Sequence, residues 1–146
     1  MNLLLDSDFL IALANKEDAS HDKAAILFQK ICNETLHALN IVFQESTTVI
    51  SKRFGMIRAK LFYIRLNKLV NKIIILDSSI ESLTWKLFLN QTKKGTSFVD
   101  CANLAVLEYY KLDGILSFDE FYKNKRIKSY AASDYNLNIS ARHKRP

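Results

Sequence analysis

The chain has 146 residues, of which 49% are hydrophobic and 25% charged, and its formal net charge is +6. These proportions are ordinary for a globular protein and exclude a collagen-like or wholly disordered chain. A chain of this length buries roughly 68–70% of its unfolded surface in one core, and no apolar run approaches the ~18 residues of a membrane span, so we expect one domain that does not enter a membrane.

The first half of the chain predicts two strand and helix pairs. Leu3, Leu4 and Leu5 form a short apolar run that ends at Asp6, and apolar residues then recur at helical spacing, which indicates a strand, a turn and a helix. This start lacks the basic region and long apolar stretch of a signal peptide, so we expect a cytoplasmic protein. The next expected elements are a helix over 21–32, a strand over 38–43 and a helix from Gln44 to Gly55, where glycine tolerates a left-handed cap.

The second half continues the alternation. The expected elements are a helix over 56–70, a strand over 73–76, a helix whose capping box is Ser78 and Glu81, a helix capped by Ser97 with Asp100, a strand over 114–117 and a short helix after Asp119. Four aliphatic residues in a row at 73–76 are typical of a strand covered on both faces. Parallel neighbours need crossover connections, so the alternation predicts an α/β fold with helices on both faces of a parallel sheet.

Four carboxylates that are distant in sequence fall at one edge of this expected sheet. Asp6 ends the first strand, Glu45 lies in the first turn after the second, Asp119 follows the fourth, and Asp100 lies in the first turn of its own helix. Ligands bind outside the carboxyl ends of such strands. Clustered acids repel one another, and a hard cation with oxygen ligands, Mg²⁺ or Mn²⁺, relieves this repulsion. The alternative is that each acid only caps a helix or favours its N-terminus.

Positive charge is concentrated in the middle of the chain. No acidic residue lies between Glu45 and Asp77, an interval that contains Lys52, Arg53, Arg58, Lys60, Arg65, Lys68 and Lys72. Such clustering suits a polyanionic partner, although a solvated helix face would look the same. We place a single domain over 1–135 and a basic tail over 136–146, which ends in Arg142, His143, Lys144 and Arg145.

The four acidic stretches together resemble the motifs of the PIN-domain nucleases, and among these the VapC-like toxins. The matching segments are Asp6-Ser7-Asp8-Phe9-Leu10-Ile11, Glu45, Ser97-Phe98-Val99-Asp100-Cys101-Ala102 and Ile115-Leu116-Ser117-Phe118-Asp119-Glu120-Phe121. The resemblance covers residues 1 to 130. It implies a three-layer α/β/α fold around a parallel sheet of four to five strands, divalent-metal-dependent hydrolysis of RNA, a homodimer, and a possible antitoxin partner.

The resemblance also implies roles for individual residues. Asp6, Asp100 and Asp119 become metal ligands, directly or through water. Glu45 becomes the further acid that holds metal or orients the attacking water. From the charge distribution rather than the resemblance, we expect the basic side chains of Lys52, Arg53, Arg58 and Lys60 to contact the RNA backbone beside this pocket.

Two further residues lie in the matching segments. Ser117 takes the place of a hydroxyl residue two before the last acid, where it can bind Asp6 or a water. Asp8 departs from the pattern, since many relatives carry Asn or Ser there; it either adds negative charge at the rim or caps the first helix, and we favour the cap.

Three other functions are compatible with parts of the sequence. A housekeeping RNA-processing nuclease and a non-catalytic PIN module that binds nucleic acid or protein would share the fold. A phosphatase of the haloacid-dehalogenase type would use Asp6 as a nucleophile and Asp8 as the general acid, but it leaves Glu45 and Asp100 without a role.

Overall fold

The computed structural model describes residues 1–123, 125 and 128–130, so the expected basic tail over 136–146 and the boundary at residue 135 lie outside the described residues. The elements are β1 (Asn2–Leu5), α1 (Ser7–Ala14), α2 (His21–Ile31), β2 (Thr35–Leu39), α3 (Asn40–Phe54), α4 (Met56–Leu69), β3 (Lys72–Ile74), α5 (Ser78–Leu89), α6 (Phe98–Tyr109), β4 (Gly114–Leu116), the 3₁₀ turn η1 (Glu120–Tyr122) and β5 (Ser129–Tyr130). In this part of the chain, no helix is both long and apolar enough to cross a membrane.

The strands form one parallel sheet in the order β3-β2-β1-β4-β5. β1 is central, and its Leu3, Leu4 and Leu5 have no exposed surface. A continuous apolar run without polar alternation suits a strand that is covered on both faces. The predicted α/β class, with a parallel sheet of four to five strands, is confirmed.

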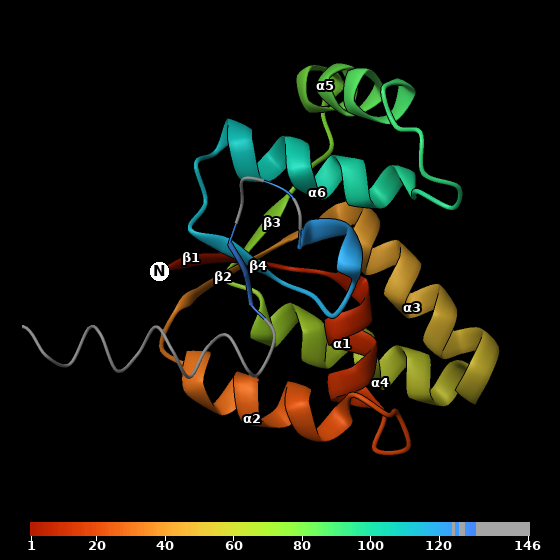
Figure 1. Ribbon diagram of the computed structural model, residues 1–146. Coiled ribbons are helices and arrows are strands. Elements are labelled where there is room, and N and C mark those ends of the chain that lie inside the picture. Colours follow the sequence, from red (N-terminus) through yellow and green to blue (C-terminus); the bar gives the residue numbers. More distant parts are fainter. Residues whose placement is uncertain (124, 126–127, 131–146) are drawn as a thin grey trace, which may run out of the picture.

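Helices cover both faces of the sheet. Figure 1 shows α5 and α6 on one side of the strands and α1, α2 and α4 on the other, with α3 packed against α1 and α4. Since all strands run in the same direction, their carboxyl ends meet at one edge. Asp6 directly follows β1 and Ser117 directly follows β4, and these two strands are neighbours.

The expected second strand over 38–43 is wrong in its boundaries. β2 ends at Leu39, and Ile41, Val42 and Phe43 lie in the first turns of α3. A short apolar run reads equally well as a buried strand or as the buried face of a helix. Glu45 therefore lies in the second turn of α3 and not in the first. The predicted end of this helix is confirmed at Gly55, whose φ is +85°.

The expected burial of the third strand is also wrong. β3 is an edge strand, and Ile73 and Ile75 are 39% and 60% exposed. The order of strands in the sheet is set by tertiary packing, so the four aliphatic residues at 73–76 do not by themselves show where in the sheet this strand lies. The helix that follows is capped by Asp77, whose Oδ1 accepts hydrogen bonds from the backbone N–H groups of Ser79 and Ile80, and not by the predicted box of Ser78 and Glu81.

Candidate active site

Asp6 lies at the centre of the candidate site and is only 3% exposed. It is the N-cap of α1, because its Oδ1 accepts the backbone N–H of Ser7 at 2.8 Å. The same oxygen accepts the side-chain amide of Asn103 at 3.0 Å, while Oδ2 accepts the hydroxyl of Ser117 at 2.9 Å. Asp6 thus joins three elements, β1, α6 and the end of β4.

The N-cap of α1 is Asp6 and not Asp8, so the favoured role of Asp8 as the cap is wrong, although Asp8 Oδ1 accepts the backbone N–H of Phe9 in the first turn. Its Oδ2 accepts the backbone N–H of Phe118 at 2.8 Å and lies 3.0 Å from the hydroxyl of Ser117. The parallel pairing of β1 with β4 places their ends side by side, and this brings Asp8 within reach of the β4 end. The single proton of Ser117 is therefore shared between Asp6 and Asp8.

Asp100 and Asp119 enter the site from the N-terminal ends of α6 and η1. The predicted capping pair of Ser97 and Asp100 is confirmed, with Asp100 Oδ2 accepting the backbone N–H of Ser97 at 3.2 Å. Its Oδ1 accepts the hydroxyl of Tyr122 at 3.1 Å. Asp119 caps η1 by accepting the backbone N–H of Phe121 at 2.7 Å. A capping role and a place in the site are therefore compatible in the same carboxylate.

Glu45 reaches this edge from α3. Its Oε2 accepts the hydroxyl of Ser7 at 2.6 Å, which ties the second turn of α3 to the first residue of α1. The four carboxylates chosen from the sequence are thus brought to one edge of the sheet, together with Asp8 and Ser117. Their metal-binding and catalytic roles stay predictions.

Burial and mutual repulsion perturb these acids. Burial, with the negative charge of Asp8 as the next contribution, raises the pKa of Asp6 to about 8. The pKa of Asp8 is also raised, again chiefly by burial. Burial and then the charge of Asp119 raise the pKa of Asp100, with a smaller contribution from Glu45. The carboxylates therefore sense one another electrostatically across four different elements.

The side chains of the candidate site offer the type of ligand atom that a hard cation prefers. All of its ligand atoms are oxygens, which Mg²⁺ and Mn²⁺ prefer, and a positive ion would offset the repulsion that raises these pKa values. Among the described residues, no three His, Cys, Asp or Glu side chains are already arranged to hold a metal ion. The residues present therefore fit a divalent cation by their chemistry, and their side chains would have to move to coordinate it.

The predicted RNA-contacting residues separate into two groups. Lys52 and Arg53 are exposed in the last turn of α3, on the helix that carries Glu45 and about 10 Å further along its axis. Arg58 instead lies over the ring of Phe54, with its Cζ 5.5 Å from the ring centroid, and Lys60 is exposed on α4. Contact with RNA stays a prediction for all four.

Sequence reasoning missed two buried polar residues of the site, Asn103 and Tyr122. Neither side chain has exposed surface, and they contact Asp6 and Asp100. Asn103 interrupts an otherwise apolar buried run from Cys101 to Leu107 and lies three positions after Asp100, a signal that could have identified it. Tyr122 carries no such signal, because only the tertiary fold brings η1 between α6 and α1, as Figure 1 shows in blue.

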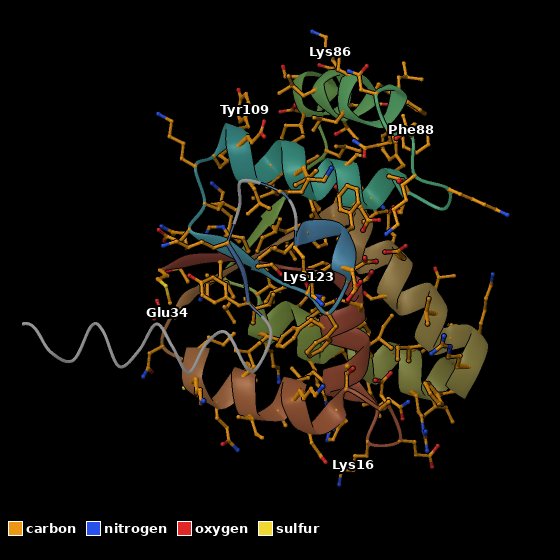
Figure 2. The ribbon with its side chains drawn as sticks, in the orientation of Figure 1. Lys16, Glu34, Lys86, Phe88, Tyr109 and Lys123 are labelled. Carbon is orange, nitrogen blue, oxygen red and sulfur yellow. The ribbon has the colours of Figure 1, made fainter. Side chains whose placement is uncertain are left out.

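An apolar groove of about 710 Å³ lies between the first four helices, away from the carboxylates. Its lining includes Leu10, Leu13, Phe28, Phe54 and Leu61. The basic residues Lys16, Arg58 and Arg65 also line it. Figure 2 shows Lys16 at the end of the molecule opposite Lys86 of α5. With the acidic Glu17 also in its lining, the groove combines mostly apolar side chains with an excess of positive charge.

Sequence comparisons find no matching family model and no matching curated protein. Solved structures do match. VapC20 of Mycobacterium tuberculosis, a sarcin-ricin loop cleaving toxin, superposes with a TM-score of 0.78 at 22% identity, over 88% of this chain and 98% of that one. VapBC2 from Rickettsia felis, bound to a DNA fragment from its promoter, gives 0.69 at 13% identity over 89% and 98%. FitAcB from Neisseria gonorrhoeae gives 0.65 at 13% identity over 90% and 98%.

The chain has the PIN-domain fold. The resemblance predicted from the four acidic stretches is thus confirmed by a fold that is shared over nearly the whole chain. The PIN-domain sheet and its flanking helices explain why carboxylates from positions so far apart in sequence meet at one edge.

Proposed function

We propose that this protein is a divalent-metal-dependent endoribonuclease and the toxin of a toxin–antitoxin pair. The observation that carries the proposal is the group of buried, mutually repelling carboxylates at the carboxyl edge of a PIN-domain sheet. Perturbed carboxylates that gather in this way are typical of functional sites. The likeness in fold between this chain and VapC20, a sarcin-ricin loop cleaving toxin, supports RNA as the substrate.

Each acid has a distinct task in the proposed reaction. Asp6, Asp100 and Asp119 would hold Mg²⁺ or Mn²⁺, which when bound lowers the pKa of a water and stabilises negative charge on the phosphate. Ser117 donates to Asp6 and keeps its carboxylate oriented. Glu45 is half-buried, and from the described residues its side chain accepts one hydrogen bond, that of Ser7. Its further lone pairs would orient the attacking water or accept its proton.

Basic side chains would position the substrate. Lys52 and Arg53 follow Glu45 on the same helix, so an RNA backbone that contacts them would extend toward the carboxylates. Phosphate contacts of this kind set register and affinity but carry no sequence information. Selection of the cleaved RNA would therefore come from other contacts or from RNA shape.

The proposal is tested by cleavage of an RNA oligomer with Mg²⁺, with Mn²⁺ and with EDTA. Asp6→Asn and Asp100→Asn should each abolish metal-dependent cleavage while circular dichroism shows an intact fold. Asp22→Asn is the matched control, because Asp22 is an exposed carboxylate in the first turn of α2. Undiminished cleavage by both site variants, or full cleavage by the wild type in EDTA, would refute the proposal.

The proposed partner is an antitoxin, supported by the likeness in fold to VapBC2 and FitAcB. Its binding segment should be largely apolar and carry acidic residues, because the groove is lined mostly by apolar side chains and its three basic residues outnumber the one acidic residue, Glu17. Expression without the partner should arrest growth, and co-expression should relieve the arrest. A harmless wild type that still cuts RNA would instead indicate a housekeeping nuclease.

The remaining parts of the proposal are a cytoplasmic location and a homodimer. Light scattering coupled to size exclusion, at several protein concentrations, measures the oligomeric state. A mass of 16.8 kDa at all concentrations would contradict the dimer.

A further inference from the structure

Two buried side chains form a continuous bridge between the carboxylates of Asp6 and Asp100. The amide nitrogen of Asn103 donates one hydrogen bond to Asp6 Oδ1 at 3.0 Å and another to the hydroxyl oxygen of Tyr122 at 3.1 Å. The hydroxyl of Tyr122 in turn donates to Asp100 Oδ1 at 3.1 Å. The bridge joins the end of β1, the middle of α6 and η1.

Every donor proton in the bridge is used once: one proton reaches each carboxylate, and the third links Asn103 to the hydroxyl oxygen of Tyr122. The amide of Asn103 has two protons and the hydroxyl of Tyr122 has one. The remaining oxygens of the acids accept from outside the bridge, since Asp6 Oδ2 accepts from Ser117 and Asp100 Oδ2 from the backbone N–H of Ser97. Each acid is thus held at both of its oxygens. Asp6 Oδ1 already accepts two hydrogen bonds, whereas Asp6 Oδ2 and both oxygens of Asp100 keep lone-pair capacity for a further partner.

Packing alone does not account for Asn103. The other buried residues of α6 are all apolar, and Asn103 Oδ1 is buried without a hydrogen-bond partner among the residues that the structure describes. An orphaned buried acceptor destabilises a fold, whereas an apolar residue of similar size would bury without this penalty. The unpaired Oδ1 is therefore a cost to stability, and within the described part of the chain the amide nitrogen donates to Asp6 and to the hydroxyl of Tyr122.

We propose that Asn103 and Tyr122 are positioning residues that fix the spacing and orientation of Asp6 and Asp100 for the divalent cation. The inference rests on the proposed metal-dependent function. Neither residue touches the substrate in this role. They act through the two carboxylates, as outer hydrogen-bond partners of metal ligands do.

The test measures Mn²⁺ affinity by electron paramagnetic resonance, in the full-length protein without RNA. Tyr122→Phe removes only the hydroxyl and should weaken Mn²⁺ binding about tenfold, at the lower end of what loss of an outer partner causes. Tyr130→Phe is the matched control, because Tyr130 is also buried but its hydroxyl faces Met1. It should leave the affinity unchanged. With RNA, kcat of Tyr122→Phe should fall while KM stays the same.

A second variant, Asn103→Leu, tests the bridge independently, and both its Mn²⁺ affinity and its thermal unfolding midpoint are measured. It should weaken Mn²⁺ binding to a similar extent while the thermal midpoint stays the same or rises, an outcome that a purely structural role would not give. The double variant should bind no worse than about the weaker single variant, since both changes break one bridge. Multiplicative losses would show independent action and overturn the bridge.

The remaining outcomes separate the bridge from the proposed function. If Asp6→Asn loses Mn²⁺ binding while Tyr122→Phe and Asn103→Leu bind within twofold of the wild type, the metal site stands and the bridge is refuted. If the wild type binds no Mn²⁺, both are refuted.

Discussion

The raised pKa of Asp6 makes the stability of the metal-free protein depend on pH in an unusual direction. An ordinary Asp has a pKa of 3.8, and burial with the charge of Asp8 raises that of Asp6 to about 8 in the fold. Between these values the folded protein keeps a proton that the unfolded chain has lost. The free energy of unfolding should therefore fall as pH rises from about 4 to about 8 and level off above that.

The size of this effect follows from the two pKa values. One unit corresponds to about 1.4 kcal/mol, so the shift of Asp6 sets a ceiling of about 6 kcal/mol over the whole interval. Between pH 5 and pH 8 the expected loss is about 4 kcal/mol. A loss of this size is a large part of the 5–15 kcal/mol (roughly) that stabilises a typical domain.

The assay is urea unfolding in EDTA, followed by circular dichroism at half-unit steps from pH 5 to pH 9. The matched variant is Asp6→Asn, which cannot titrate and keeps an oxygen to accept the backbone N–H of Ser7. Burial and the charge of Lys72 lower the pKa of His37, which reduces stability as pH falls below about 6.5. This opposite contribution is present in both proteins and cancels in their difference.

The expected result is a wild-type curve that falls more steeply than that of Asp6→Asn up to about pH 8 and runs parallel above it. Mn²⁺ should restore the stability of the wild type at pH 8, because the bound cation favours the ionised carboxylate. Parallel curves from pH 5 to pH 8 would refute the argument that Asp6 is held protonated by its surroundings.

Three further predictions follow from single contacts. Gly114→Ala should destabilise the fold by about 1–3 kcal/mol in urea unfolding, because the new Cβ would lie 2.3 Å from the ring of Tyr130; an unchanged midpoint would contradict the packing of β5. Ser117→Ala should lower RNA cleavage by about tenfold or more while Ser117→Thr retains it, since Asp6 and Asp8 share this hydroxyl. Lys52→Ala and Arg53→Ala should each lower the salt dependence of RNA binding by about 0.7 in log–log slope; unaltered slopes would remove both from the interface.

The parts of the fold that were predictable share a local cause. Leu3, Leu4 and Leu5 are followed at once by Asp6, and an apolar run that ends in a capping acid marks both a buried strand and the start of a helix. The capping pair of Ser97 and Asp100 is encoded in the same way, within four residues. Both acids were therefore placed correctly at the sheet edge from their neighbours alone.

The parts that were not predictable depend on contacts between distant segments. The exposure of Ile73 follows from the edge position of β3, and the reach of Asp8 to Phe118 follows from the pairing of β1 with β4. The bridge through Asn103 and Tyr122 requires η1 to dock beside α6. No spacing along the chain encodes such a contact, whereas spacing does encode caps and helix faces.

Helix N-termini offer an explanation of how so many acids are tolerated at one edge. Asp6 caps α1, Asp100 lies in the first turn of α6 and Asp119 caps η1, so each carboxylate accepts backbone N–H groups at a positive helix end. These interactions favour the ionised form, yet the pKa values of Asp6 and Asp100 remain raised. The compensation supplied by the backbone is thus incomplete. A bound divalent cation would supply the remainder, which is why folding and metal binding should be coupled in this protein through the same carboxylates.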